Sequence, residues 1–486
     1  MMKKVSFIFF LLCLGIFLGF SSAEEINTLK GDMNGNGVVN YIDYRMLSEY
    51  LNLVGSDAPY DSNKDLNSDG IVDAADLESL GLEINSLELH GFYPKEIFKT
   101  NNFNQKHLLK YFNDLSFAFY DVTYNDLSIE NYGIGINSTI FNENNIEALE
   151  IAKQNQIPIR FNVFSNMGVL KNILPFEERR QQLIYMIMGI MNQEILKDTG
   201  LYWDGMVIDF EELRNTNSAM NPVTGIRETT LYDGKLMSEL YTLFLQELKQ
   251  AISSAGAGKD LYVAVPYSSY YDGYNYREIG NIADKVIVMA HDYEPKHNIK
   301  KSDVMLYLNN PTLVNSIAPV SKIDSAIQAL TNQETGIQDP KKIILQISFG
   351  TAQWKFANIE KPEDWQTISG ETVGNYSTPS YSQIYQRMIS ETDQGDPNYI
   401  KPLESPYMTY YNSVDKSYNF ILYEDSRSVA EKIKKAQEAG FGGISIWSLG
   451  RIPSYQNPAD NNGTKELYFD VWTQILQSVN LKFISE

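Results

Sequence analysis

The chain has 486 residues and a formal net charge of −21, from 61 acidic and 40 basic side chains. This charge disfavours nucleic acid as a partner, because polyanions bind proteins through clustered Lys and Arg. It also disfavours tight, purely electrostatic binding to anionic wall polymers. Hydrophobic residues make up 43% of the sequence, which is typical of a globular protein with a large core and excludes a disordered chain.

The first 23 residues have the pattern of a secretory signal. Lys3 and Lys4 precede an apolar run over residues 5–20, and small residues follow up to Ala23. We therefore expect cleavage after Ala23 and export of the mature protein. The only cysteine, Cys13, lies in this signal, so we expect no disulfide in the mature chain. No later apolar run is long enough to span a bilayer, so the exported protein is expected to be soluble.

Two twelve-residue segments, 32–43 and 65–76, have the spacing of a calcium-binding loop. Each has oxygen-bearing side chains at loop positions 1, 3, 5, 9 and 12, and glycine at position 6, where the chain turns sharply. The expected ligands are Asp32, Asn34, Asn36, Asn40 and Asp43 in the first loop, and Asp65, Asn67, Asp69, Asp73 and Asp76 in the second. Two copies in tandem favour two structural Ca²⁺ ions over the alternative of two Asx-rich turns.

Residues 29–83 resemble a type I dockerin, the duplicated calcium module that binds a cohesin on a scaffold protein. The resemblance rests on both loops and on a helix expected over residues 44–53, whereas the second helix is expected to be cut short at Gly81. The loop positions that face cohesin in that family are Tyr41-Ile42 in one repeat and Ala74-Ala75 in the other. The two halves are therefore not interchangeable there. The resemblance implies a cohesin partner, and the alternative is a calcium-stapled spacer.

From residue 87 onward, eight apolar runs alternate with amphipathic stretches. Strands are predicted near residues 87–93, 115–122, 158–165, 203–211, 261–267, 284–293, 342–350 and 442–449, and helices near 144–155, 176–197, 233–255, 317–332, 427–439 and 465–479. This alternation favours a parallel (β/α)₈ TIM barrel over residues 87–486, preceded by a small all-α, paired EF-hand-like domain. The chief insertion, 351–420, and the loops 213–232 and 294–312 are expected to shape the substrate-binding subsites.

Residues 204–211 read Asp-Gly-Met-Val-Ile-Asp-Phe-Glu and end the fourth predicted strand. Asp209 and Glu211 are two residues apart, so both point to the same face, where each shifts the pKa of the other. Active sites of TIM barrels lie at this end of the strands. Such a pair suits acid catalysis on a glycosidic bond, for which one carboxyl must stay protonated near neutral pH. The alternative is a charged strand end with two solvated acids.

Residues 87–486 resemble glycoside hydrolase family 18, whose motif on strand four is Asp-Gly-x-Asp-x-Asp-x-Glu. Asp204, Gly205, Asp209 and Glu211 stand in register with this motif, and Val207 stands where the first central Asp is expected.

Further blocks follow in the order of that family. Residues 288–292, Val-Met-Ala-His-Asp, stand where the family has Met-x-Tyr-Asp on strand six. Residues 345–350 fit strand seven, and residues 443–450 fit strand eight with its sugar-stacking Trp447. The segment 423–428 resembles the branch of bacterial spore-cortex and cell-wall glycosidases, in which the first central Asp is also often absent.

The resemblance implies substrate-assisted hydrolysis with retention and without a catalytic cofactor. Glu211 would protonate the leaving oxygen, the substrate's own acetamide carbonyl would attack the anomeric carbon, and Asp209 would orient the acetamide. The residues expected to contact substrate are Asp204, Met289, His291, Asp292 and Trp447. For Asp292, the alternative is a residue that orients its neighbours without touching substrate. Two alternatives stay open for His291, which replaces the family's Tyr: it donates to the acetamide oxygen, or it only fills space. For Trp447, the alternative to a subsite floor is a core tryptophan.

The implied substrate is a β-1,4-linked N-acetylglucosamine polymer, either chitin or peptidoglycan, and the core of N-glycans is a third possibility that corresponds to an endo-β-N-acetylglucosaminidase. The dockerin favours chitin, and the strand-eight block favours wall glycans. An alternative hypothesis is a non-catalytic carbohydrate-binding barrel, but family members of that kind usually lack the Glu that this chain retains as Glu211. A third is a calcium-dependent assembly module whose barrel activity is incidental. The implied location is extracellular, with attachment to the cell surface through a scaffold complex.

Overall fold

The computed structural model describes residues 29–35, 38–39, 41–54, 60–83, 87–100, 105–137, 141–142, 144–256, 258–268, 270–310, 315–357, 359, 368–453, 455, 466–479 and 482–483. The expected secretory signal lies outside the described residues. So do Asn36 and Asn40 of the first calcium loop.

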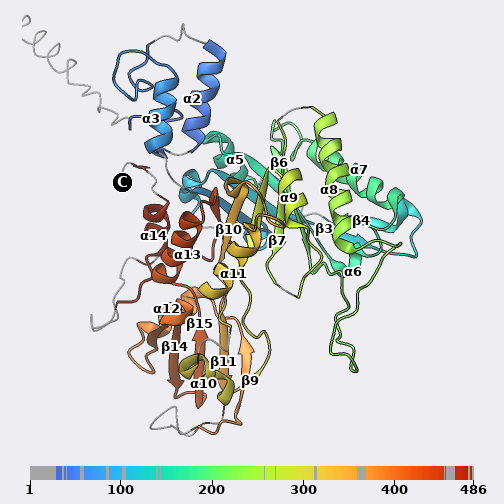
Figure 1. The fold of residues 1–486 in the computed structure, drawn as a ribbon. Helices are drawn as coiled ribbons and strands as arrows, with labels where there is room; N and C mark the ends of the chain where they lie inside the picture. The colour runs from blue at the N-terminus through green and yellow to red at the C-terminus, as the bar shows by residue number, and fades with distance from the viewer. Residues whose placement is uncertain are drawn as a thin grey trace, which may run out of the picture.

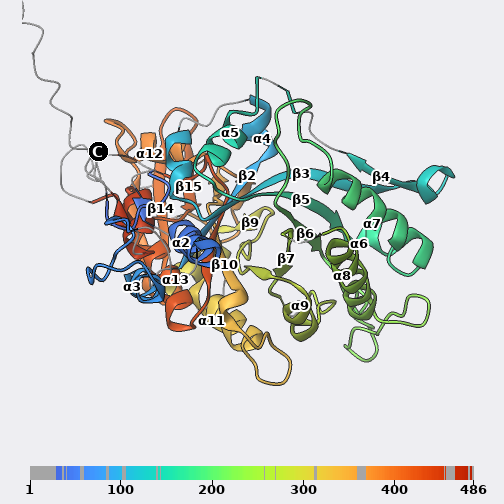
Figure 2. The same cartoon turned by 90° about the horizontal axis from the view of Figure 1, so that it is seen from above.

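Eight parallel strands form a closed barrel (Figures 1 and 2). In ring order they are β2 (Glu88–Pro94), β3 (Asp114–Tyr124), β5 (Ile159–Asn166), β6 (Gly205–Glu211), β7 (Asp260–Pro266), β8 (Lys285–Met289), β10 (Ile343–Ser348) and β16 (Gly443–Trp447). The pairing of β16 with β2 closes the ring, and the short β4 (Ile134–Asn137) extends β3 outward as an antiparallel hairpin. The predicted (β/α)₈ barrel is confirmed.

The helices predicted between the strands are present. They are α5 (Glu147–Gln154), α7 (Glu177–Met191), α8 (Met237–Ser254), α11 (Val320–Leu330), α13 (Ser426–Glu438) and α14 (Val471–Ser478), and the shorter α4 (Lys95–Thr100), α6 (Met167–Leu170) and α9 (Tyr276–Ile282) accompany them. Both views show α7 and α8 side by side on the outside of the barrel. The sixth predicted strand, 284–293, is too long: β8 ends at Met289, and Asp292 already has a left-handed backbone with φ of 64°.

Side chains of β6 point alternately toward the surrounding helices and into the barrel, so the strand contributes to two apolar clusters. Met206, Ile208 and Phe210 pack outward in the large cluster between strands and helices. Val207 points inward, into a small cluster that fills the barrel with Phe92 and residues of three other strands. This alternation is what a parallel strand buried on both faces requires. It also places Asp209 and Glu211 inside the barrel, at its C-terminal end.

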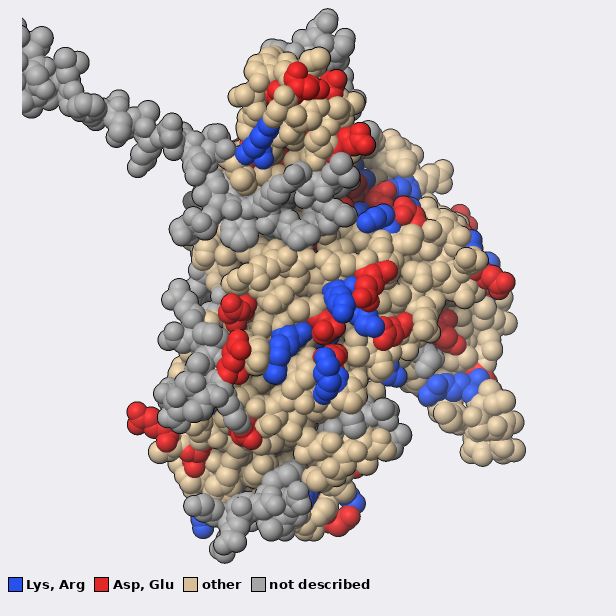
Figure 3. All heavy atoms as spheres, turned by 60° about the vertical axis from the view of Figure 1, so that its left-hand side comes forward, with Lys and Arg blue, Asp and Glu red and all other residues tan. Residues whose placement is uncertain are grey.

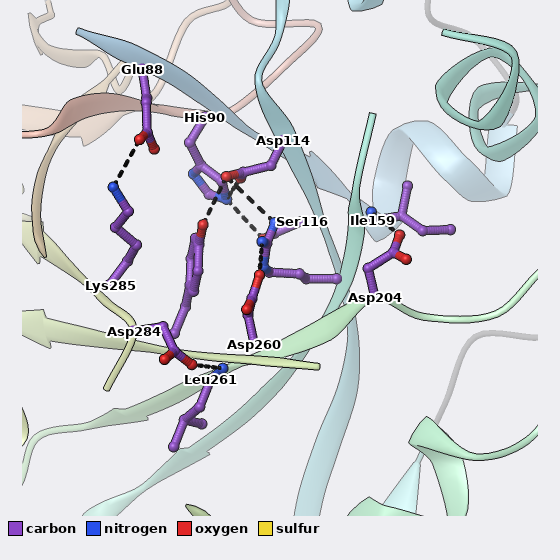
Figure 4. A network of polar contacts seen from close by, with 12 residues as sticks. Glu88, His90, Asp114, Ser116, Ile159, Asp204, Asp260, Leu261, Asp284 and Lys285 are labelled. Atoms are coloured by element: carbon purple, nitrogen blue, oxygen red, sulfur yellow. Dashed lines mark hydrogen bonds and ion pairs between the residues drawn. The ribbon is translucent and has the colours of Figure 1, made fainter. Parts of the chain in front are cut away.

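A buried polar network fills the N-terminal end of the barrel (Figure 4). His90 contacts the hydroxyl groups of Ser116 and Ser445 at 2.8 and 2.7 Å, and burial lowers its pKa to about 4, so the imidazole is neutral at pH 7. Beside it the Arg160 guanidinium donates to Asp260 at 2.7 Å and lies 3.4 Å from Asp114. Buried charges that are paired in this way hold strand ends together.

The insertion after β10, together with a short strand from the loop after β8, forms a second, antiparallel sheet that was not predicted as strands. Its order is β13 (Asp396–Ile400), β14 (Ser405–Asn412), β15 (Ser417–Leu422), β11 (Ala352–Phe356), β12 (Val373–Ser377) and β9 (Ile299–Lys300), with α10 (Lys301–Asn309) and α12 (Tyr381–Met388) beside it. Trp354 and Phe420 lie at the centre of its own apolar core. Figure 1 shows this sheet at the bottom of the molecule.

The N-terminal module contains the helices α2 (Tyr41–Val54) and α3 (Ala74–Glu83), which pack around Leu47, Val72 and Leu80. The first helix was expected, but the prediction that the second is cut short at Gly81 is wrong, because α3 continues to Glu83. The module contacts the barrel through the side chain of Asn34, which donates to the carbonyl of Asn155 just before β5. Its short β1 (Val38–Val39) pairs with the C-terminal β17 (Lys482–Phe483).

Candidate active site

The acid pair lies at the C-terminal end of β6, where the strand leaves the barrel. Asp209 is buried, with 7% of its surface exposed, and Glu211 at the end of the strand is half-buried. Both stem from inward-facing positions of one strand, as their spacing predicts. Glu212 follows with φ of 62° and is exposed, so the chain turns away from the barrel directly after the acid pair.

Asn162, on the neighbouring strand β5, holds Asp209 in place. Its side-chain amide donates to Asp209 Oδ2 at 3.1 Å, and it is itself buried. The other carboxylate oxygen, Asp209 Oδ1, is buried and has no hydrogen-bond partner. Sequence reasoning missed Asn162. The only available signal was a polar residue at an inward position of a buried strand.

The surroundings separate the pKa values of the two acids. Burial raises the pKa of Asp209 to about 6, and the hydrogen bond from Asn162 limits this rise. Burial raises the pKa of Glu211 to about 8, and the negative charge of Asp209 adds to the effect. At pH 7 Glu211 therefore keeps its proton while Asp209 is mostly ionised. A protonated carboxyl beside a charged one is the arrangement that general acid catalysis on a glycosidic bond requires.

His291 lies in a chain of polar contacts across the end of β8. Its Nε2 is 2.6 Å from Gln346 Oε1 on β10, and its Nδ1 is 3.2 Å from Asp292 Oδ1. Burial alone lowers the pKa of His291, but the contacts with Asp292 and Gln346 outweigh it and raise the pKa above its ordinary value. Both ring nitrogens face protein groups in this arrangement. Nε2 is engaged with Gln346, whereas Nδ1 lies near Asp292 without a hydrogen bond, so a donation from Nε2 to a substrate acetamide would require Gln346 to give way.

Asp292 lies between His291 and Lys296, and it also lines the cleft at this end of the barrel. Its carboxylate contacts His291 and accepts a hydrogen bond from Lys296 Nζ at 2.7 Å. Burial by itself raises the pKa of Asp292, but these two partners hold it well below its usual range. Asp292 thus stays ionised over the whole physiological range and orients His291.

A cleft of about 660 Å³ opens between the ends of β8, β10 and β16 and the inserted sheet. Trp447 lines it and also packs edge-to-face on Phe92, with ring centroids 5.4 Å apart, so this residue belongs to both the cleft and the barrel core. Met289 lies beneath, partly buried against the same interior cluster. The cleft thus lies between the ends of these strands and the inserted sheet, and neither Asp209 nor Glu211 is among the residues that line it.

Glu294 is a second buried acid in this cleft that sequence reasoning did not single out. Only 7% of it is exposed, and its Oε2 has no hydrogen-bond partner. Burial, reinforced by the charge of Asp292, raises the pKa of Glu294 to about 7. An unpartnered carboxyl that lines a cleft is suited to hydrogen-bond a sugar hydroxyl or amide.

The prediction that Asp204 contacts substrate is wrong. Asp204 precedes β6 and lies at the N-terminal end of the barrel, where its Oδ2 accepts a hydrogen bond from the backbone of Ile159 at 2.8 Å (Figure 4). Glu211 is the seventh and last residue of β6, which begins directly after Asp204, so about 23 Å separates the two along the strand. Asp204 instead anchors the start of β6 to the start of β5.

The acidic loops of the N-terminal module provide oxygen groups suited to calcium. Asp65 and Asp76 are almost fully buried, and no basic side chain in the described part of the chain forms an ion pair with either. Their oxygens accept hydrogen bonds from the loop backbone, as for Gly70 N to Asp65 Oδ2 at 3.0 Å. Among the described residues no three His, Cys, Asp or Glu side chains are grouped as a metal site. The burial of unpaired carboxylates fits a bound cation.

Surface charge agrees with a partner that is not nucleic acid. On the face shown in Figure 3, the basic side chains lie beside acidic ones, and acidic side chains gather at the tip of the N-terminal module. In the described parts of the chain no helix combines the length and the apolarity that crossing a membrane requires.

A closed parallel barrel whose fourth strand ends in a buried acid pair, with a cleft over its C-terminal end, defines a glycosidase of the TIM-barrel class. The chain belongs to glycosyl hydrolases family 18, whose family profile matches residues 90–451. A second family, the dockerin type I domain, matches residues 30–85.

Known proteins similar to this chain include bacterial cortex-lytic enzymes and a chitinase. The cortical fragment-lytic enzyme of Bacillus anthracis is 22% identical over 223 residues, which are 45% of this chain and 44% of that protein. The chain therefore spans less than half the length of this relative. The chitinase of Chromobacterium violaceum ATCC 12472 has a TM-score of 0.54 at 16% identity, covering 81% of this chain and 99% of that chain. The spore cortex-lytic enzyme of Bacillus megaterium QM B1551 has a TM-score of 0.53 at 15% identity, covering 81% and 74%. These structural likenesses show the shared barrel fold.

Proposed function

We propose that the barrel hydrolyses a β-1,4-linked polymer containing N-acetylglucosamine, by a substrate-assisted retaining mechanism. The observation that carries this proposal is the acid pair, in which a protonated Glu211 with a pKa of about 8 stands beside Asp209 with a pKa of about 6. Membership of family 18 supports the choice of an acetamido sugar, because in this family the substrate provides the nucleophile.

In this mechanism Glu211 donates its proton to the oxygen of the leaving sugar. The carbonyl oxygen of the substrate's acetamide attacks the anomeric carbon, and an oxazolinium ion forms as the glycosidic bond breaks. Asp209, ionised and held by Asn162, accepts a hydrogen bond from the acetamide N–H and stabilises the positive charge. Glu211, now ionised, takes a proton from a water molecule as the water oxygen attacks the anomeric carbon. The oxazolinium ring opens, and the product retains the anomeric configuration.

The remaining polar groups position the substrate. Trp447 provides an apolar surface in the cleft for a sugar ring, and Glu294 faces the same space. His291, tied to Asp292 and Gln346, holds the side of the site opposite Asn162 and brings a positive charge that lowers the pKa of both catalytic acids. Val207 fills the barrel beneath Asp209 with an apolar side chain, so Asn162 is the hydrogen-bond donor to the Asp209 side chain in the described part of the chain.

The test is product analysis on chitin oligomers, purified peptidoglycan and a high-mannose glycoprotein, with Glu211→Gln as the inactive control. Hydrolysis of an acetamido polymer with retained anomeric configuration is expected, together with competitive inhibition by a thiazoline analogue of N-acetylglucosamine. Cleavage within the N-glycan core alone would make the enzyme an endo-β-N-acetylglucosaminidase of glycoproteins. A glycosyl ester trapped on Asp209 or Glu211 would replace the mechanism by the two-carboxylate scheme. Binding of sugar without any turnover would reduce the barrel to a carbohydrate-binding module.

We further propose that residues 29–83 bind two Ca²⁺ ions and a scaffold cohesin, and that the protein is exported. The burial of Asp65 and Asp76 without basic partners supports the calcium sites, and the dockerin match supports the partner. Calorimetric titration of the purified protein with Ca²⁺, and then with a cohesin, tests both. Heat of Ca²⁺ binding without heat from any cohesin would leave a calcium-stapled spacer.

A further inference from the structure

The loops that follow β6 and β7 place two arginine side chains around one tyrosine. Arg214 follows Glu211 by three residues, and its Nη1 donates to the hydroxyl of Tyr270. The guanidinium carbons of Arg214 and Arg227 lie 4.8 and 4.7 Å from the centroid of the Tyr270 ring. Both arginines are half-buried. Two like charges therefore share one aromatic ring close to the acid pair.

Tyr271 links this cluster to the acids. The rings of Tyr270 and Tyr271 pack edge-to-face with centroids 5.1 Å apart. Besides burial, the charges of Glu212 and Glu211 raise the pKa of Tyr271 while Arg214 lowers it, so these groups lie within electrostatic range of one ring. The arginine cluster thus lies on the loop that leaves the barrel directly after the acid pair and on the loop after β7, which hydrogen bonds join.

Hydrogen bonds between the two loops hold the cluster in place without the arginines. The backbone N–H of Asn215 donates to Asp272 Oδ1 at 2.8 Å, and the N–H of Gly273 donates to the carbonyl of Leu213 at 3.0 Å. The Asp272 carboxylate is therefore engaged with the loop, and Glu228 likewise accepts from the side chain of Asn221 at 2.6 Å.

Neither arginine has an anionic partner in the described part of the chain. The Nε atoms of Arg214 and Arg227 are buried and have no hydrogen-bond acceptor, and no carboxylate lies within ion-pair distance of either guanidinium. Some other arginines here, such as Arg180 and Arg427, have a carboxylate partner. Arg179 and Arg387 have none in the described part of the chain, and each stacks alone on an aromatic ring. In a chain of net charge −21, an unpaired and preorganised pair of guanidinium groups is suited to an anion from outside.

We propose that Arg214, Arg227 and Tyr270 form a carboxylate-binding subsite, and that the substrate of the barrel bears a carboxylate near the cleaved bond. This inference rests on the proposed function of the acid pair. In the ring of eight strands β6 lies opposite β16, so a polymer that starts in the Trp447 cleft and crosses Glu211 next reaches the two arginines. Among polymers of N-acetylated hexosamine, wall glycans with muramic acid have such carboxylates, on the lactyl ether or on its peptide, whereas chitin has none.

The experiment compares kcat/KM on oligosaccharides of equal length. The four substrates are a neutral N-acetylglucosamine oligomer, a peptide-free wall glycan with free lactyl carboxylates, the same glycan after conversion of these groups to methyl amides, and a glycan that keeps its peptides. Charge-assisted hydrogen bonds change affinity by roughly tenfold or more. The double variant Arg214→Gln/Arg227→Gln should therefore lose at least about tenfold more activity on carboxylate substrates than on the neutral oligomer. Lys197→Gln, whose side chain is 89% exposed, is the control for net charge.

The three wall-glycan substrates show whether the bound carboxylate belongs to the lactyl ether or to the peptide. Preference of the wild type for the free lactyl glycan over its methyl amide assigns the subsite to the lactyl group, and preference for the peptide-bearing glycan alone assigns it to the peptide. An equal loss on all substrates, or wild-type indifference to the carboxylate, would overturn the subsite.

Failure of the subsite can be told apart from failure of the proposed function. If the wild type hydrolyses none of the substrates, the proposed function fails. Calorimetric binding then still decides the subsite. In a Glu211→Gln background, the lactyl glycan should bind at least about tenfold tighter than its methyl amide, and the added double substitution should remove this difference. Equal affinities would overturn the subsite whatever the activity.

Discussion

Replacing Glu211 with Gln should remove most hydrolysis and, at alkaline pH, make the barrel more stable. Loss of the proton donor costs general acid catalysis roughly 10²-fold or more. The gain in stability has a separate cause. Burial and the charge of Asp209 raise the pKa of Glu211 to about 8. Ionisation of Glu211 therefore destabilises the folded state relative to the unfolded chain, in which the carboxylate is solvated.

The magnitude follows from the two pKa values. Below pH 4.5, the ordinary value, the carboxyl is protonated in both states and costs nothing. Between pH 4.5 and about 8 the unfolded chain releases the proton first, so the free energy of unfolding falls as the pH rises. Over this interval the free energy of unfolding of the wild type falls by about 5 kcal/mol at most. Because Glu211 is only half-buried, we expect a fall of about 2–5 kcal/mol. Gln has no proton to release, so the variant should gain this amount over the wild type across the same interval.

Urea unfolding followed by tryptophan fluorescence measures this difference for the barrel, because all five tryptophans lie between residues 203 and 472. The two proteins should have similar midpoints near pH 4.5 and diverge up to pH 8.5. Glu212→Gln is the graded control: this neighbouring carboxylate is exposed, and its charge makes only the last contribution to the raised pKa of Glu211, so its removal should change the pH dependence much less than Glu211→Gln does. A constant difference between Glu211→Gln and wild type over this pH range would refute the reasoning, as would a variant that is less stable at pH 8.5.

Three further outcomes are expected. Asn162→Ala removes the hydrogen bond that lowers the pKa of Asp209, so kcat should fall about tenfold and the acidic limb of the kcat/KM profile should move to higher pH. His291→Phe removes a positive charge that lowers the pKa of both Asp209 and Glu211, so the profile should move to higher pH; an unchanged profile would make His291 a space-filling residue. Removal of Ca²⁺ by a chelator should shift one calorimetric transition, that of residues 29–83, and leave the barrel transition in place, whereas two unmoved transitions would make the loops ordinary turns.

The barrel was predictable because its strands are buried on both faces and appear in the sequence as separate apolar runs. The inserted sheet was not. In β14, Ser-Pro-Tyr-Met-Thr-Tyr-Tyr-Asn, only Ser405, Pro406 and Met408 are buried, and its tyrosines and polar residues show neither a continuous apolar run nor a clean alternation. β9 is two residues long and joins the sheet from a different βα loop, so only the tertiary structure brings it next to β12.

Only the part of the candidate site that lies on a single strand could be predicted from the sequence. The spacing of Asp209 and Glu211 places both acids inside the barrel because strand geometry has a period of two. Asn162 and Gln346 lie on other strands, and their contacts depend on register, which a single sequence does not provide. The error for Asp204 has a different origin. A motif can combine residues from both ends of one strand, and the first Asp of this motif serves the backbone at the far end.

The cleft and the N-terminal module lie at opposite ends of the barrel. The acid pair and the cleft residues lie at the C-terminal end of the strands, with the inserted sheet beside the cleft. Asn34 attaches the N-terminal module next to the start of β5, at the other end. Figure 1 accordingly shows the module and the inserted sheet at opposite ends of the molecule. A partner bound to the module would then leave the cleft open to a polymer. Because the buried network around His90 and Arg160 closes the barrel between them, we expect loss of the module to leave the pKa values of Asp209 and Glu211 unchanged.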